Sequence, residues 1–131
     1  MDAQALRRRV LAKLSEQRAL VRALLRLRVQ LRGSLFERFA VCGKDGCACR
    51  TGQKHGPYYV LSTRSGGEGG FAYLAADQAE DAATMVRSHR KFREGLRTLQ
   101  KVNADVVVLL RSYQMSMARE GGRRIGLRAD C

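Results

Sequence analysis

The sequence predicts an α+β protein in which two long, coiled-coil-like helices flank a small β-hairpin module. Residues 3–32 contain neither Gly nor Pro and are rich in Leu, Ala and Arg, which are strong helix formers. Residues 57–63 and 71–74 are rich in β-branched and aromatic residues, which favour strands. Residues 77–118 carry mostly apolar residues at alternating intervals of four and three, which predicts a helix that packs through one seam.

These stretches divide the chain into four expected segments. A basic N-terminal helix spans 1–34 and ends at Gly33, because the Gly-Ser pair there breaks helices. A Cys/His-containing β module spans 35–76, and a long heptad helix spans 77–118. The basic tail at 119–131 follows the heptad pattern and is expected to stay disordered until an anion binds.

The β module is expected to hold a short strand at 36–41 and a hairpin of 57–63 with 71–74. The turn of this hairpin is the glycine-rich stretch 65–70, which is predicted to be flexible. A hairpin of this size is not stable alone. A metal at one end and helices on one face would supply the missing stability.

The long helix is expected to begin with a capping pair, Asp77 and Glu80. Its apolar seam is longer than the β module can cover, so another helix has to bury it. The N-terminal helix and a second copy of the chain would do so, which predicts a homodimer. The seam positions are Met85, His89, Phe92, Leu96, Leu99, Asn103, Val106, Leu110, Tyr113 and Met117.

A cluster of potential metal ligands lies between the first two expected strands. Cys42, Cys47 and Cys49 fall within eight residues, and His55 follows six residues later. Zn²⁺ takes four thiolate or imidazole ligands at tetrahedral corners, and this set supplies four. Several glycines between them allow the tight turns by which a short loop folds around an ion. The sequence therefore predicts a structural Zn²⁺ site that clips the β-hairpin module.

Two other interpretations of the cysteine cluster remain open. The thiols can be plain reduced cysteines in a glycine-rich loop, or they can form a redox-active or iron–sulfur site. A disulfide scaffold is not favoured, because Cys131 is the one further cysteine and no signal peptide is evident. Free cysteines without an export signal predict a reducing, cytoplasmic location.

The charge of the chain predicts a polyanionic partner. Its 25 Lys and Arg against 12 Asp and Glu give a net charge of +13 and a pI near 10.6. Such a surface repels itself unless an anion neutralises it, so DNA or RNA is the expected partner. An anionic membrane is the second candidate partner on charge alone, although we expect no membrane partner. We also expect no membrane-spanning helix, because the longest aliphatic run, 106–110, is far shorter than the ~20 residues that such a helix needs.

Basic residues of the first helix and of the tail are expected to contact phosphates, and residues around the cysteine loop are expected to contact bases or sugars. The helix and tail candidates are Arg7, Arg8, Arg9, Arg18, Arg22, Arg26, Arg123, Arg124 and Arg128. The candidates near the cysteine loop are Lys44, Arg50, Lys54, Tyr58 and Tyr59.

The sequence contains no phosphate-cradling glycine motif, no Ser/His/Asp set and no carboxylate pair in a catalytic setting. We therefore expect a non-enzymatic nucleic-acid-binding protein with no small-molecule substrate. One alternative is a zinc-stabilised dimeric adaptor whose helices bind another protein. A second alternative is a thiol redox sensor.

The Cys/His block also carries a family resemblance. Cys42-Gly-Lys-Asp-Gly-Cys-Ala-Cys49, followed by His55-Gly-Pro-Tyr-Tyr59, resembles the C-G-K-x-x-C-x-C…H-G-P-Y-Y block of an uncharacterised family of small bacterial proteins. The resemblance covers roughly residues 33–110, where that family has the block ahead of a hairpin and a long helix. It implies a bacterial origin and an association with mobile elements, and it carries over no activity.

Overall fold

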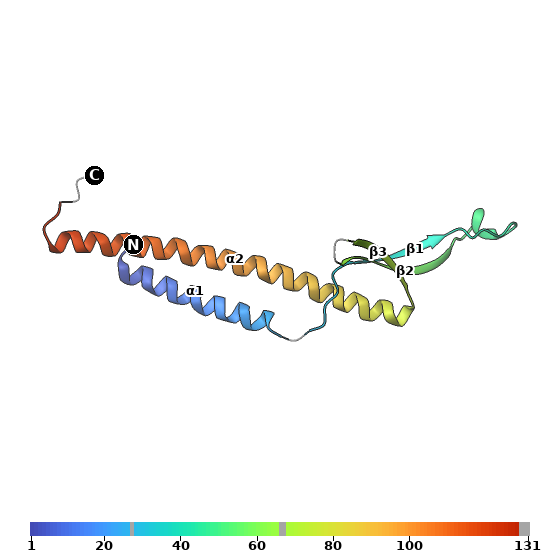
Figure 1. The fold of residues 1–131 in the computed structure, drawn as a ribbon, viewed down its shortest axis with the longest axis horizontal. Helices are drawn as coiled ribbons and strands as arrows, with labels where there is room; N and C mark the ends of the chain where they lie inside the picture. The colour runs from blue at the N-terminus through green and yellow to red at the C-terminus, as the bar shows by residue number, and fades with distance from the viewer. Residues whose placement is uncertain (27, 66–67, 129–131) are drawn as a thin grey trace. The chain divides into compact units, whose positions relative to one another are not determined.

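The computed structural model describes residues 1–26, 28–65 and 68–128. Its two helices and three-stranded antiparallel sheet confirm the predicted α+β class (Figure 1). The elements, in chain order, are α1 (Ala3–Leu24), β1 (Ser34–Ala40), the 3₁₀ helix η1 (Ala48–Arg50), β2 (His55–Ser65), β3 (Glu68–Leu74) and α2 (Ala76–Arg124).

The chain forms two compact units, one of residues 1–26 with 93–131 and one of residues 27–92. The first unit is an antiparallel pair of helices. At one end Gly95 lies against Leu24, and in the middle Gln17 Nε2 donates to Asn103 Oδ1 at 2.6 Å. Towards the other end, Leu6, Val10 and Leu109 form a small buried core against Tyr113.

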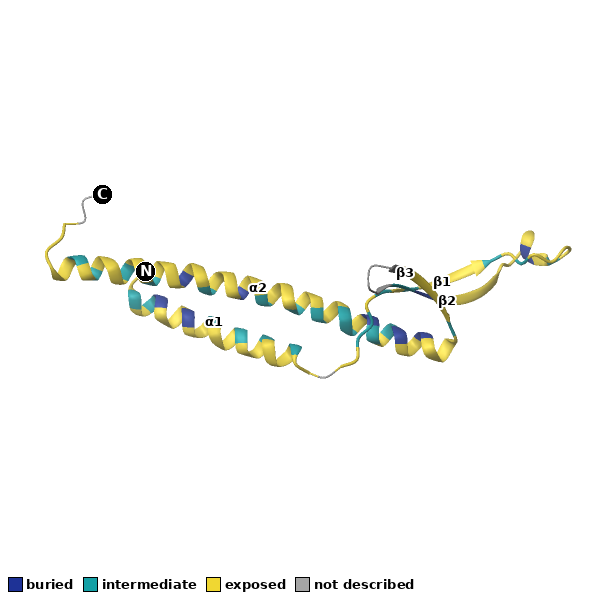
Figure 2. Cartoon of the chain, viewed as in Figure 1, coloured by how far each residue is buried: buried dark blue, intermediate teal, exposed yellow. Residues whose placement is uncertain are grey.

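The buried side of α2 is rotated from the predicted seam by about one residue. Val102 and Leu109 are buried, at 3% and 9% exposure, although neither belongs to that seam. Leu96 and Leu110, which do belong to it, are 41% and 47% exposed. Each residue turns a helix by about 100°, so α1 covers one flank of the seam and leaves the other flank in solvent. Figure 2 shows the alternation of buried and exposed positions along α2.

Helix α1 ends at Leu24, nine residues before the predicted break at Gly33. Residues 28–32 belong to the second unit instead, where the Leu31 N–H donates to the carbonyl of Met85 at 3.1 Å. This tertiary contact outweighs the helix propensity of the sequence, which is a weak preference. The start of α1 is capped by Asp2, whose Oδ1 accepts a 2.7 Å hydrogen bond from the Ala5 N–H.

Helix α2 begins and ends differently from the prediction. Its first turn is capped by Gln78, whose side-chain oxygen accepts from the Ala75 N–H at 3.1 Å, rather than by Asp77 with Glu80.

At the C-terminal end, α2 continues through the first part of the tail that was predicted to be disordered. Residues 129–131 of that tail lie outside the described residues. The helix ends at Arg124, and Gly126 just after it has φ +76°. The Leu127 N–H donates to the Gly122 carbonyl and the Gly126 N–H donates to the Arg123 carbonyl. This pattern is a Schellman motif, in which a left-handed glycine turns the chain so that the N–H groups after the helix donate to its last carbonyls. No helix among the described residues has the length and apolar content to cross a membrane.

The second unit is the sheet, in the order β1-β2-β3, packed on the first turns of α2. In the predicted hairpin turn, Ser65 pairs with Glu68, so the strands are longer than expected, and residues 66 and 67 lie outside the described part of the chain. Ala79, Ala82 and Val86 of α2 are at most 4% exposed. Their small side chains let the helix lie close to one face of the sheet (Figures 1 and 2).

Candidate metal centre

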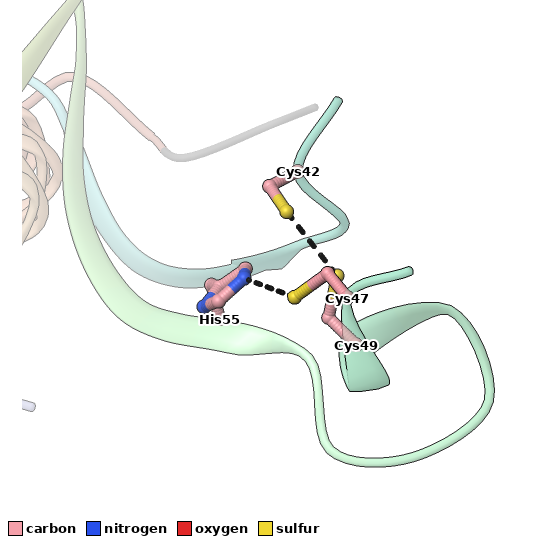
Figure 3. A group of neighbouring side chains, drawn as sticks. All are labelled: Cys42, Cys47, Cys49 and His55. Atoms are coloured by element: carbon pink, nitrogen blue, oxygen red, sulfur yellow. Dashed lines mark hydrogen bonds between the residues drawn. The ribbon is translucent and has the colours of Figure 1, made fainter. Parts of the chain in front are cut away.

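The four predicted ligands converge at one end of the sheet. One potential ligand atom from each of Cys42, Cys47, Cys49 and His55 lies within 4.8 Å of all the others. The Sγ atoms of Cys42 and Cys49 are 3.6 Å apart, and Cys47 Sγ is 3.4 Å from His55 Nε2 (Figure 3). These three cysteines are free thiols, and the sulfur separation is far beyond the ~2.05 Å of a disulfide bond.

Two separations within this group are compatible with a tetrahedral metal ion. With Zn–S near ~2.3 Å and Zn–N near ~2.0 Å, tetrahedral angles place two sulfurs about 3.8 Å apart and a sulfur and a nitrogen about 3.5 Å apart. The observed 3.6 and 3.4 Å are close to these separations. The four residues therefore form a group compatible with a metal site, and the identity of the metal belongs to the proposal below.

Strand pairing brings His55 to the cysteines. His55 opens β2 and pairs with Ala40, the last residue of β1, so it lies across from the chain that leads into Cys42. The pairing shifts register between Arg38 and Ala40, opposite Gly56. Gly56 has φ +136°, and a Cβ there would lie 2.8 Å from the Arg38 carbonyl oxygen, so only glycine fits next to the histidine.

The other two cysteines are held by η1 and its flanks. Cys47 precedes η1 and Cys49 lies inside it. The turn before them uses Gly46 in the left-handed region, at φ +79°. Cys49 is buried at 3% exposure, Cys42 and Cys47 are half-buried, and His55 is exposed. The centre thus has one sheltered side and one side open to solvent.

A backbone amide favours the thiolate form of Cys47. A hydrogen bond from the Cys49 N–H, helped by the side chains of Cys49, Cys42 and His55, lowers the pKa of Cys47 to about 6. A thiolate is the form that binds metal, and amide donors around a metal-bound sulfur orient it and offset its charge. Of the nearby charged residues, Arg50 contacts Asp45 at 3.7 Å, and Lys44 and Lys54 are exposed.

The two tyrosines predicted to contact nucleic acid lie on opposite faces of the sheet. Tyr58 and Tyr59 are consecutive residues of β2, and consecutive strand residues point to opposite faces. Tyr59 is half-buried beside Ala79 and Ala83 of α2, whereas Tyr58 is 44% exposed. Only Tyr58 therefore remains on an open face.

The basic candidates of α1 are exposed but do not form one continuous row. The row predicted from Arg18, Arg22 and Arg26 is broken, because α1 ends at Leu24. Consecutive helix residues point about 100° apart, so the exposed run Arg7, Arg8 and Arg9 spreads around the helix.

The basic candidates at the end of α2 are partly compensated. Arg123 donates to Glu120 at 2.6 Å, and Arg124 lies 3.5 Å from the same carboxylate. Hydrogen bonding and attraction from Arg123, followed by those from Arg124, lower the pKa of Glu120. Arg128 is exposed after the helix ends.

A further basic row was not predicted. Arg93, Arg97 and Lys101 are spaced by four residues along α2, are all exposed, and lie on the side of the helix away from its buried positions. The same spacing rule that was applied to the first helix identifies them in the sequence. They differ from the α1 row because the helix beneath them is unbroken.

Comparison with known proteins gives a family match. Residues 4–84 match the family described as a domain of unknown function, DUF6788. No curated protein and no solved structure matches the chain. The matched region starts nearer the N-terminus than the resemblance over 33–110 and contains the whole Cys/His cluster. The bacterial origin and the association with mobile elements stay predictions.

We predict close to one zinc ion per chain, and loss of this metal in His55→Gln. His89→Gln is the matched control, because His89, the other histidine of the chain, lies on α2 outside the cluster. Elemental analysis of the purified proteins measures the metal content. Metal-free wild-type protein would contradict the zinc assignment. If Cys42 and Cys49 then oxidised reversibly, the redox-sensor alternative would gain support.

Proposed function

Because the chain belongs to the DUF6788 family, a domain of unknown function, its role has to be inferred from its own residues. We propose that it is a non-enzymatic nucleic-acid-binding protein in which a structural Zn²⁺ ion clips the sheet. Zn²⁺ held by four protein ligands keeps no open position for a substrate, which is typical of structural sites.

The observation that carries the proposal is the excess of basic residues in both units. Residues 1–26 and 93–131 contain fifteen Lys and Arg against six Asp and Glu, and residues 27–92 contain ten against six. An excess in each unit means that neither unit can neutralise itself. A polyanion such as DNA or RNA supplies the missing charge and releases its own counterions on binding.

The exposed basic row on α2 is suited to phosphate contacts. Arg93, Arg97 and Lys101 recur about every 6 Å along a helix that rises ~1.5 Å per residue, and extended side chains can reach successive phosphates of a strand from such a row. Phosphate contacts of this kind provide affinity without sequence choice. The α1 arginines, led by Arg18 and Arg22, add further contacts in the same unit.

A second role, dimerisation through the helices, is favoured by apolar residues left exposed in the first unit. Leu14 and Val21 of α1 are 40% and 36% exposed, and Leu96, Leu110 and Met117 of α2 are 41% to 47% exposed. Helical periodicity places both sets on one side of the helix pair. A second copy of the chain would bury this side by coiled-coil-like packing. The adaptor alternative places a different protein there.

Nucleic-acid binding is tested by its salt dependence. Log affinity for duplex DNA falls with log salt at about −0.9 per phosphate neutralised, so about five contacts predict a loss of roughly 500-fold between about 50 and 200 mM salt. Replacing Arg93, Arg97 and Lys101 by Gln should reduce the slope by nearly three units. Fluorescence anisotropy with labelled oligonucleotides measures both quantities.

The control for this experiment replaces Arg123 and Arg124 by Gln. Both guanidinium groups already contact Glu120, so we expect a smaller change in slope. Helicity and zinc content should be unchanged in both variants. Failure of the wild-type protein to bind duplex or single-stranded nucleic acid at low salt would contradict the proposal and leave the adaptor role.

Dimerisation predicts that Leu110→Asp converts a dimer to a monomer in analytical ultracentrifugation. Leu110 is 47% exposed. A carboxylate there should therefore destabilise the contact with a second copy and leave the α1–α2 core intact. Val108→Asp is the control, because Val108 is 59% exposed on another side of α2. A monomeric wild-type chain, or a dimer that Leu110→Asp leaves intact, would refute this packing.

A further inference from the structure

The face of the sheet that points away from α2 carries a set of aromatic side chains. Phe36 pairs with Val60, and Val60 pairs in turn with Tyr73, so these three residues cross the sheet in one row. Arg38 pairs with Tyr58, and Ser62 pairs with Phe71. Directly paired residues and alternate residues along a strand share a face. The aromatic face is therefore made by Phe36, Arg38, Tyr58, Val60, Phe71 and Tyr73.

The rings of the aromatic face are open to solvent. Phe36 and Tyr58 are 43% and 44% exposed, Tyr73 is 61% exposed and Phe71 is 73% exposed. Val60, which lies on the central strand between Phe36 and Tyr73, is only 2% exposed. This low exposure indicates that the neighbouring side chains cover it. On the opposite face Leu61 is also buried, at 7% exposure.

This exposure is not a scatter of single apolar residues. The face holds two of the four phenylalanines and two of the four tyrosines of a chain that has no tryptophan. Aromatic rings are normally among the largest contributors to a buried core or an interface. Here four of the eight aromatic residues of the chain lie on one face of a three-stranded sheet, where they take little part in the core. Such an arrangement indicates a ligand with flat, π-rich surfaces or an apolar partner.

The charge on this face favours a nucleic acid over an apolar protein partner. Arg38 lies among the rings, and its Nη1 donates a 2.8 Å hydrogen bond to the Tyr73 hydroxyl. Among the residues described on the aromatic face there is no Asp or Glu, since Glu37 of β1 points to the other face. A guanidinium group attracts phosphate and also stacks on bases. The hydrogen bond to Tyr73 places the guanidinium group beside the Tyr73 ring.

We propose that the aromatic face binds the unpaired bases of a single-stranded nucleic acid by stacking. This inference rests on the proposed function and specifies the form of nucleic acid that the sheet takes. A duplex keeps its bases stacked inside, whereas a single strand exposes base faces to aromatic side chains. Stacking tolerates any base, so the face binds with little sequence choice. Arg38 adds a contact to phosphate or base.

Tryptophan fluorescence tests the placement of the bases. The chain has no tryptophan, so Tyr58→Trp and Tyr59→Trp each introduce a single reporter at adjacent positions on opposite faces. An oligothymidylate of about 15 nucleotides, which cannot pair with itself, should quench the fluorescence of Tyr58→Trp at saturation because its bases stack on the ring. The fluorescence of Tyr59→Trp should change little.

Truncation of the most exposed ring tests its contribution. Phe71→Ala should weaken oligothymidylate binding by about 5- to 150-fold, the factor that corresponds to one stacked base. The salt slope should stay the same, because no charge is removed, and Phe71→Tyr should bind like the wild type. Since Phe71 is 73% exposed, its truncation should leave the far-ultraviolet circular dichroism unchanged.

The outcomes separate this inference from the proposed function. Binding to duplex DNA, with no quenching of Tyr58→Trp and no effect of Phe71→Ala on oligothymidylate affinity, would overturn the stacking face while leaving nucleic-acid binding in place. A changed sedimentation coefficient in Phe71→Ala would overturn it too, because the face would then be an interface between protein chains. No binding to either nucleic acid at low salt would remove both proposals.

Discussion

The register in which β2 pairs with β1 decides which side chains of residues 34–65 meet. The pairing of Ala40 with His55 carries the histidine across to the start of the cysteine loop. The pairing of Phe36 with Val60 in the same ladder places the aromatic side chains on the face away from α2. Because side chains alternate along a strand, a slip of one residue would move every one of them to the other face. The candidate metal centre and the aromatic face therefore depend on one register.

Little apolar burial is available to hold this register. Among the described residues of the sheet the buried apolar side chains are Val60 and Leu61, and α2 contributes mainly small residues such as Ala79 and Ala82. Small units with so little buried apolar surface often add a metal, a disulfide or a second chain for stability. Binding of a structural zinc ion can supply free energy to folding, because the unfolded chain lacks the assembled site. On this account the metal centre fixes the register from one end of the sheet, and the helix covers one face.

The sequence was most informative where the determinants are local. The four candidate ligands Cys42, Cys47, Cys49 and His55 lie within fourteen residues, and the structure brings all four together. The sequence indicated this group because residue type and spacing are visible in the chain. The opposite roles of Tyr58 and Tyr59 were missed, since only the pairing and the position of α2 show which face is open. The aromatic face as a whole was missed for the same reason, as its members come from three strands.

The helix predictions failed at positions set by tertiary contacts. Residues 25–32 have the composition of a helix, but the hydrogen bond from Leu31 to Met85 belongs to a different unit from α1. The heptad pattern predicted the long helix correctly, but it identified only part of the side that is buried. The buried residues Val102 and Leu109 lie next to the predicted seam and not in it. The end of α2 depends on the left-handed conformation of Gly126. Gly121 and Gly122 are also glycines but stay helical, so the sequence does not show which glycine follows the end of the helix.

The most direct test of the account is amide hydrogen exchange measured on the zinc-loaded protein and again after a chelator removes the metal. The account predicts that β1 and β2 lose protection, because the metal holds their register. It predicts that α1 and residues 93–124 of α2, which form the other unit, keep theirs. Unchanged protection of β1 and β2 after loss of the metal would contradict the claim that the metal centre holds the sheet together.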